Sequence, residues 1–274
     1  MSSVVEAGTG RGVSALAAAR PARPGALSST LTFAWRAVQK VRRDPTQILE
    51  ALGVPIMFTL VFGFLFGGAL AGSTSSYMQF YIPGIVVFTG IMISMRIGAV
   101  VNLDNSREVT DRFRALAIWR PAAIVGTLLG NNVLYVVGCA VAVAVGLAVG
   151  FRPDGGVLGV LATILITLVF VFSFSWVYVV FGLALKSPTA ALSACQAIVF
   201  PVSFVSNFFV PQETLPGWLQ AVVGLNPFAL TITAARGLAH GTATAGEVGA
   251  ALAGCAALVA VFAPLSMFLY RRRA

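Results

Sequence analysis

The chain has 274 residues, of which 58% are hydrophobic and 10% are charged, and its formal net charge is +9. This composition excludes a water-soluble domain, in which about a quarter of the residues are charged, and is typical of a protein that crosses a membrane several times. Lys and Arg gather beside the apolar runs, so we attribute the positive charge to cytoplasmic flanks rather than to nucleic-acid binding.

The N-terminal segment is polar and basic. Residues 1–27 are rich in Ala, Gly, Ser, Pro and Arg without an apolar period, which predicts a disordered cytoplasmic tail. The next residues place apolar side chains on one helical face among basic ones. This pattern predicts an amphipathic interfacial helix on the cytoplasmic leaflet, although a basic flank to the first span would look the same. The apolar face comprises Leu31, Ala34, Trp35, Val38 and Val41.

Six apolar runs of membrane-spanning length follow, which predicts an all-α fold with six transmembrane helices. Lys and Arg are frequent before the first run, after the second and at the end of the chain, and Lys186 follows the fourth run. The other loops hold only Arg152 and Arg236. By the positive-inside rule, both termini are cytoplasmic. The runs are 52–70, 82–101, 122–150, 157–185, 190–210 and 248–270.

The stretch 208–241 combines many apolar side chains with repeated prolines and glycines. Such breaks do not suit a lipid-facing span, and such apolar content does not suit a solvated loop. We predict an extracytoplasmic re-entrant hairpin of two short helices, with Trp218 and Phe228 in the outer lipid boundary. Arg236 would either cap a helix or meet a lipid phosphate. The residues that define the hairpin are Pro211, Trp218, Asn226, Pro227 and Arg236.

The spans hold no visible group for catalysis or ion coupling. Every Asp and Glu lies in a loop or at a span end, and the only histidine, His240, lies outside. Ion-coupled carriers usually place ionisable groups near the midplane, and an enzyme needs a nucleophile, a base or a metal cluster. A phosphate loop is also absent, because Leu185 precedes Lys186-Ser187 where a glycine is required. We therefore expect no enzyme, and energy for uphill transport must come from a partner.

The loop 102–120 is the natural docking place for that partner. Val109, Phe113 and Leu116 share one helical face, and charged residues fill the remainder. The loop is either a coupling helix that docks in a groove of a cytoplasmic ATPase or an amphipathic helix on lipid headgroups. The candidate coupling residues are Arg107, Asp111, Arg112, Phe113 and Leu116.

Polar residues in the fifth run fall within one helical sector, with an aromatic residue on the same line. Such a stripe lines a translocation path or forms a polar seam between helices. In the second run, Arg96 has the azimuth of Thr89 and either lines a cytoplasmic vestibule or snorkels to the headgroups. The candidate path residues are Ser193, Gln196, Phe200, Ser203, Asn207, Arg96 and Thr89.

Several separated motifs occur in order along residues 30 to 270. They are Arg43-Asp44-Pro45, Tyr81-Ile82-Pro83-Gly84, Asp111-Arg112-Phe113-Arg114-Ala115-Leu116, Phe209-Val210-Pro211, Leu215-Pro216-Gly217-Trp218-Leu219, Asn226-Pro227 and Arg236-Gly237. Together they resemble the permeases of ABC-2-type exporters, particularly the daunorubicin-resistance type. One departure is Ala117, where this family often has a proline in Leu-Pro-x-x-Arg, so the coupling helix would extend farther here.

The resemblance implies a permease domain over residues 28–274 in a bacterial plasma membrane. It implies a second permease copy or paralogue and two separately encoded ATPase subunits, which would bind ATP and Mg while this chain holds no cofactor. It also implies export of a hydrophobic or amphipathic drug, polyketide or lipid. The alternatives are a permease for a lipid-linked glycoconjugate or polysaccharide, a secondary carrier and a membrane assembly protein.

Overall fold

The computed structural model describes residues 45–106 and 122–272, together with Thr32, Trp35 and Gln39, which are helical. The predicted tail 1–27, most of the predicted interfacial helix and most of the loop 102–120 lie outside the described residues. The structure therefore defines the helices from the first apolar run onward, apart from the segment 107–121.

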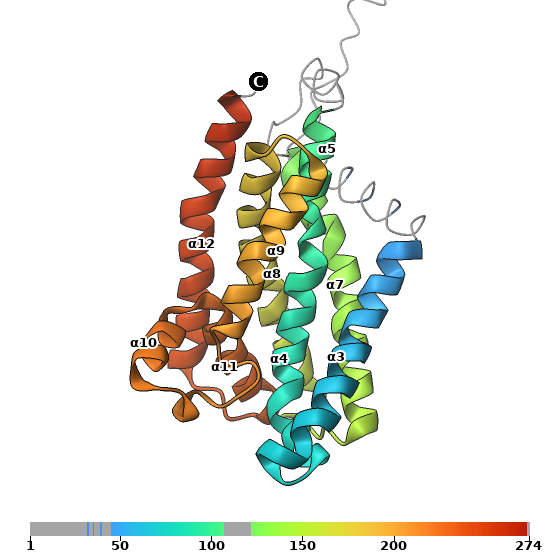
Figure 1. Ribbon diagram of the computed structural model, residues 1–274, viewed down its shortest axis with the longest axis vertical. Helices are drawn as coiled ribbons and strands as arrows, with labels where there is room; N and C mark the ends of the chain where they lie inside the picture. The colour runs from blue at the N-terminus through green and yellow to red at the C-terminus, as the bar shows by residue number, and fades with distance from the viewer. Residues whose placement is uncertain (1–31, 33–34, 36–38, 40–44, 107–121, 273–274) are drawn as a thin grey trace, which may run out of the picture.

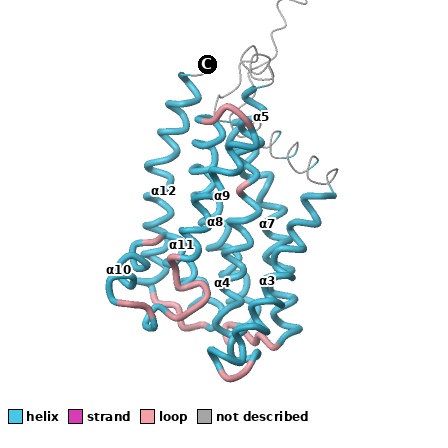
Figure 2. Tube along the Cα trace, in the orientation of Figure 1, coloured by secondary structure: helices cyan, strands magenta, loops and turns pink. Residues whose placement is uncertain are grey.

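The described residues form a bundle of α-helices without a β-strand (Figure 1). Loops lie mainly at the two ends of the bundle (Figure 2). The elements are α3 (Pro45–Ala71), α4 (Thr74–Ser94), α5 (Arg96–Ser106), α7 (Ala122–Val149), α8 (Gly156–Ala184), α9 (Pro188–Phe204), η1 (Gln212–Thr214), α10 (Gly217–Leu225), α11 (Pro227–His240) and α12 (Ala245–Arg272).

Five of the described helices are long and apolar enough to cross a membrane: α3, α4 continued by α5, α7, α8 and α12. The pair α10 and α11 is bent by 84° at Asn226, as a broken span or a re-entrant loop would be. α9 has 17 residues, which at about 1.5 Å per residue is slightly short of a bilayer core. Length and composition therefore give five or six spans.

The direction of the chain shows what α9 does. α8 starts beside α11, where Gly155 N donates to Ala239 O, and ends beside α5, where Asn102 Nδ2 donates to Leu185 O. α12 runs the same way and ends near the C-terminus (Figure 1). The chain must return between two parallel helices, and α9 makes that return. α10 and α11 stay at the other end, which we call the hairpin end; the end with the C-terminus is the C-terminal end.

α4 is the central helix of the bundle. Of the 18 residues in its most apolar stretch, 78% are buried. The corresponding stretches of α3 and α12 are 22% and 11% buried. It packs on α3, α7, α8 and α11. Gly84 allows a further close approach, that of the segment after α9, because an added Cβ would lie 2.9 Å from Cδ2 of Phe208. The second predicted span is therefore the core of the described bundle.

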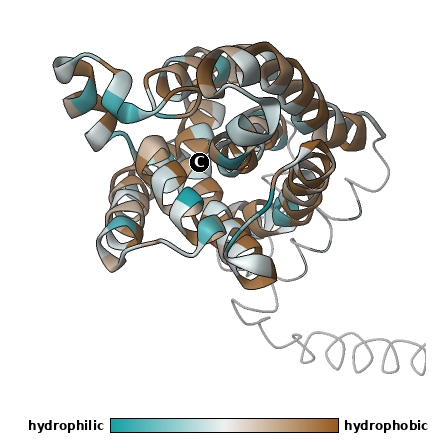
Figure 3. Ribbon diagram, turned by 90° about the horizontal axis from the view of Figure 1, so that it is seen from below, coloured by the Kyte–Doolittle hydropathy of each residue, from teal (hydrophilic) through white to brown (hydrophobic). Residues whose placement is uncertain are grey.

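The outer surface of the bundle is apolar. Viewed along the bundle from the hairpin end, hydrophobic residues dominate the helices and hydrophilic residues gather in loops and turns (Figure 3). This surface suits contact with lipid or with another membrane protein. Its exposed large residues include Phe64 and Leu65 on α3, Leu158, Leu161 and Leu165 on α8, and Val261 and Phe268 on α12.

The observed helices differ from the predicted spans in several places. The first helix begins at Pro45 rather than at 52. The second span begins earlier, at Thr74, because the Ser73 hydroxyl accepts a hydrogen bond from Ser76 N and caps the helix. The same span is interrupted at Met95, between α4 and α5. The fifth span ends at Phe204 rather than 210, because Val205 leaves helical geometry with ψ of 61°.

Candidate functional site

The outer face of α9 is exposed and partly polar. α9 buries Ala191, Cys195 and Val199 and packs against α5 and α8. Ser193 and Gln196 lie on the opposite face, and so does Phe200, with 45% of its surface open. The polar side chains of this face therefore lack full cover from the described part of the chain.

The predicted polar stripe divides where α9 ends. Ser203 is buried in the last turn, and Asn207 is buried beyond the helix. Asn207 Nδ2 donates to Thr233 Oγ1 at 2.8 Å, and Asn207 O accepts from Arg236 Nη2 at 3.2 Å. The helical sector thus holds for Ser193, Gln196 and Phe200, while Asn207 belongs to the contact with α11.

The two candidate path residues of the second span lie apart from each other. Thr89 is completely buried and contacts α7, where a Cβ added to Gly138 would lie 2.9 Å from its Cγ2. Arg96 is half-buried and begins α5 directly after the break at Met95.

An aromatic row extends from the exposed face of α9 to α3. Phe200 stacks on Phe204 with ring centroids 6.4 Å apart, and Phe204 stacks on Phe209 at 5.4 Å. Phe209 then contacts Phe62, at 5.0 Å, and Phe66, at 6.4 Å. The only sequence signal for this row is the spacing of four residues between phenylalanines within α3 and within α9.

Asn226 joins the end of α9 to the start of α11. Its Oδ1 accepts from Phe228 N at 3.0 Å and caps α11, in which Pro227 occupies the first turn. Its Nδ2 donates to Val202 O at 2.8 Å and to Val205 O at 2.7 Å. One side chain therefore satisfies backbone groups at both helix ends, which explains the Asn-Pro pair physically.

The other hairpin residues lie at different depths. Pro211 precedes η1, and its carbonyl accepts from the Thr214 hydroxyl at 2.7 Å. Trp218 on α10 is 72% exposed. Phe228 is completely buried, with its ring near Phe170 and Phe208. The prediction that Phe228 lies in an outer lipid boundary is therefore wrong, because α11 turns inward after the bend at Asn226.

Arg236 points into the protein and binds two backbone carbonyls. Its Nε donates to Phe80 O on α4 at 3.0 Å, and its Nη2 donates to Asn207 O. The guanidinium also lies 3.7 Å from the centroid of the Phe80 ring. Nearby, Tyr77 Oη donates to Phe209 O at 2.9 Å. These contacts fix the segment after α9 to one turn of α4.

His240 takes part in a second group of contacts with α4. Its Nε2 lies 2.9 Å from Gln79 O, and its Nδ1 lies 3.2 Å from Oδ2 of Asp154. The Gln79 side chain donates to Gly150 O at 2.8 Å and accepts from Arg152 N at 2.9 Å. The sequence places His240 outside the spans without a role, since nothing local indicates these long-range contacts.

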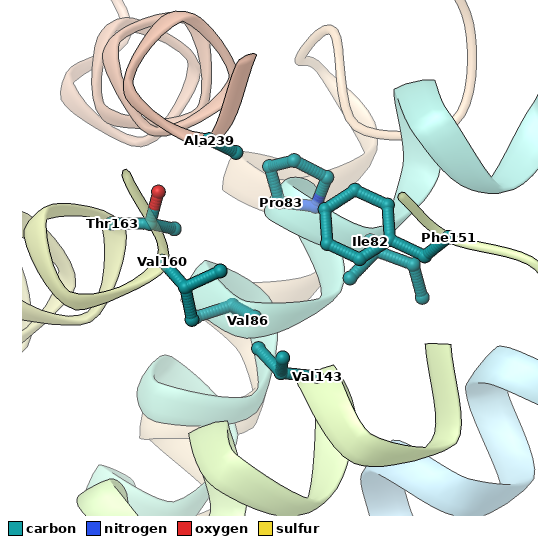
Figure 4. A pocket seen from close by; sticks show the side chains of 8 residues that line it. All are labelled: Ile82, Pro83, Val86, Val143, Phe151, Val160, Thr163 and Ala239. Carbon is teal, nitrogen blue, oxygen red and sulfur yellow. The ribbon is translucent and has the colours of Figure 1, made fainter. Parts of the chain in front are cut away.

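A small apolar cavity lies between α4, α7, α8 and α11 (Figure 4). It has room for about one water molecule, whereas pockets for drug-sized ligands measure roughly 300–1,000 Å³. This cavity is therefore too small for such a compound. It is lined by Ile82, Pro83, Val86, Val143, Phe151, Val160, Thr163 and Ala239.

Residues 45–106 and 122–272 contain no group of three or more His, Cys, Asp and Glu placed to hold a metal ion. The three cysteines, Cys139, Cys195 and Cys255, are buried free thiols.

The candidate coupling residues Arg107, Asp111, Arg112, Phe113 and Leu116 lie outside the described residues. The structure does describe α5, which leads into that segment. Asn102 on α5 donates to Gly182 O at 2.9 Å and to Leu185 O at 2.7 Å, at the end of α8. α5 also packs against α9.

Comparison with known sequences gives consistent matches. Residues 28–239 match the family described as ABC-2 type transporter. The chain is 45% identical to a Streptomyces coeruleorubidus protein named daunorubicin resistance ABC transporter permease protein DrrB1, over 93% of this chain and 90% of that protein. It is 25% identical to a Mycobacterium tuberculosis protein named probable doxorubicin resistance ABC transporter permease protein DrrC, over 78% of each chain. It is 22% identical to the putative transport permease ycf38 of Cyanophora paradoxa, over 72% of this chain and 69% of that protein.

Proposed function

Since the chain belongs to the ABC-2 type transporter family, we propose that it carries a hydrophobic or amphipathic compound out of the cytoplasm or the inner leaflet of a bacterial membrane. It is homologous to permeases of drug-resistance ABC exporters. The cargo is a drug, a polyketide or a lipid, moved without chemical change. ATP and Mg bind to a separate ATPase subunit.

The exposed polar and aromatic face of α9 is the observation that carries this proposal. An amide in hydrocarbon without a hydrogen-bond partner costs several kcal/mol, so the face with Ser193 and Gln196 meets water, cargo or another protein. Phe200 starts the aromatic row beside it. We assign this face to the cargo path, at the contact with a second permease copy. Arg96 lies near the cytoplasmic mouth, whereas Thr89, Ser203 and Asn207 support the path from inside the bundle.

The proposed topology has six spans, with both termini in the cytoplasm and the re-entrant hairpin outside. The chain direction supports it, because α9 is the return between α8 and α12. Charge placement supports it as well. Lys186, Arg271 and Arg272 lie at the C-terminal end, whereas Arg236 at the hairpin end binds backbone carbonyls.

We also propose that the segment after α5 docks on the ATPase through Phe113 and its charged neighbours. α5 then connects this segment to the cargo path. It is hydrogen-bonded to the end of α8 through Asn102 and packs against α9. A displacement of the docked segment would therefore reach the polar face of α9 through packed helices.

Purification from the native host tests the assignment. The tagged chain should retain an ABC ATPase, and the reconstituted complex should hydrolyse ATP faster when daunorubicin is added. Phe113→Asp should reduce both association and stimulation, with the exposed Leu161→Asn on α8 as a control. Transport driven by a proton gradient without ATP would contradict the proposal and favour a secondary carrier. Stimulation by a lipid-linked glycoconjugate but not by daunorubicin would favour the alternative cargo.

A further inference from the structure

Pro83 removes a backbone hydrogen bond from the most buried helix of the protein. In a regular α-helix, the amide of residue 83 would donate to the carbonyl of Gln79, and proline has no amide hydrogen. Pro83 itself is buried, and its ring forms part of the cavity wall (Figure 4). The partly buried carbonyl of Gln79 therefore lacks its helical donor and is open to a donor from elsewhere.

The donor comes from α11, 161 residues farther along the chain. His240 Nε2 lies 2.9 Å from Gln79 O, the carbonyl that Pro83 leaves free. Arg236 Nε donates to the next carbonyl, Phe80 O, at 3.0 Å. Arg236 and His240 are four residues apart, so they lie one above the other on one face of α11. Two successive carbonyls of α4 thus meet two successive turns of α11.

We propose that Arg236 and His240 form a latch that fixes the hairpin on α4: His240 supplies the donor that Pro83 removes from Gln79 O, and Arg236 binds the next carbonyl, Phe80 O. Both are positioning residues: they hold α11 and, through Asn207, the segment after α9, next to the cargo path. Their importance for export depends on the proposed function. The latch itself does not, and it can be tested without any cargo.

The contacts of His240 also depend on its protonation. Both atoms that face its ring nitrogens, Gln79 O and the Asp154 carboxylate oxygen, are acceptors. A neutral imidazole carries one N–H, so only the imidazolium ion donates to both. The imidazolium ion therefore completes both contacts of the latch, whereas a neutral ring can donate in only one of them.

The other charged groups near this contact have partners of their own. Arg152 Nη1 donates to Leu147 O and Phe151 O. On α12, the Glu247 carboxylate accepts from Thr244 N. Arg236 itself donates to Phe80 O and Asn207 O. Within the described ranges, Asp154 is therefore the acidic group that faces His240 directly.

A double-mutant cycle with Pro83 distinguishes a latch from ordinary packing. The full-length chain is placed in lipid nanodiscs, and amide hydrogen exchange is measured in α11. His240→Ala should speed this exchange about tenfold when Pro83 is present, equivalent to ~1.4 kcal/mol. In a Pro83→Ala background, the restored amide can donate to Gln79 O, so His240→Ala should speed exchange only about twofold. Pro264→Ala, which alters the proline in α12, should give no such rescue.

A second arm does not depend on Pro83. His240→Gln keeps a side-chain amide that can donate to Gln79 O, so α11 should exchange more slowly in this variant than in His240→Ala. Equal effects of His240→Ala in both proline backgrounds would overturn the latch, and so would equal exchange in His240→Gln and His240→Ala. If Pro83→Ala does not fold, the comparison of the two His240 variants alone decides. Daunorubicin export is measured separately, so loss of the proposed function leaves both arms interpretable.

Discussion

Polar side chains are hydrogen-bonded inside the protein at the hairpin end, whereas they are exposed on the outer face of α9. At the hairpin end, Asn226, Arg236 and His240 are hydrogen-bonded to backbone carbonyls of other segments. On α9, Ser193 and Gln196 are exposed. Polar groups that hold a membrane bundle together are mostly paired inside it, so the exposed ones on α9 support the proposed contact with cargo or with a second permease copy. Substitutions should accordingly damage folding in the first region and transport in the second.

The largest loss of folded protein is expected from a substitution at Gly84, which lies against Phe208. Gly84→Leu would drive a side chain into Phe208, whose Cδ2 would lie 2.9 Å from the first added atom. Overpacking of this kind costs about 3 kcal/mol, so the yield of folded protein in size-exclusion chromatography should collapse. Gly68→Leu on exposed α3, where no atom lies within 4 Å, is the control and should leave the yield unchanged. Equal yields for both variants would show that Phe208 does not constrain α4.

Asn226 should have the next largest effect. Asn226→Ala removes the cap of α11 and leaves two carbonyls at the end of α9 unpaired, at a combined cost of about 2–4 kcal/mol. The thermal midpoint of the purified chain should fall markedly. Asn226→Asp retains the cap but loses both donors, so its midpoint should lie between those of the unmodified chain and the alanine variant. An aspartate variant as stable as the original would mean that the contacts to α9 contribute nothing.

A substitution at Gln196 tests the role of the exposed outer face of α9. Gln196→Leu replaces an exposed amide by an apolar side chain, so the thermal midpoint should stay the same or rise slightly. Under the proposed function, export by the complete transporter, with daunorubicin as the probe, should fall about tenfold, equivalent to ~1.4 kcal/mol of lost interaction. Leu161→Ile on the exposed face of α8 serves as the control, with unchanged export. Full export by the Gln196 variant would indicate that this face lies against lipid or a passive seam.

The smallest change in stability is expected at Trp218, which lies at the hairpin end but is largely exposed. Its side chain is 72% exposed, so Trp218→Ala should change the free energy of unfolding by no more than about 0.5 kcal/mol. Urea titration in detergent measures this change. A loss comparable with that of Asn226→Ala would place Trp218 in a structural contact with a second copy.

Local features of the sequence predict much of the fold. Apolar runs locate the long helices, because each contains about the length that a bilayer requires. Repeated prolines and glycines separate α10 and α11 from the long helices, and Asn226-Pro227 marks the bend between them. The predicted face of α9 also holds as far as Phe200, since helical periodicity is a local property.

Features that depend on distant contacts could not be predicted. No glycine marks the end of α9, so periodicity alone extends the helical sector to Asn207, which instead binds Thr233. Phe228 resembles an interfacial residue in the sequence, whereas the direction of α11 is set by its packing on α4 and α8. The contact between His240 and Gln79 joins positions 161 residues apart, and no pattern near either one indicates the other.

The most direct test of the central claim, that the open face of α9 lines the cargo path, is thiol labelling. Cys139, Cys195 and Cys255 are buried, so they can be replaced before single cysteines are placed at Gln196 or Phe200. In the assembled transporter, a water-soluble maleimide should label both positions, and daunorubicin should slow the reaction. Leu161→Cys on α8 should remain unlabelled. Failure of the reagent to label Gln196→Cys or Phe200→Cys from either side of the membrane would contradict the claim.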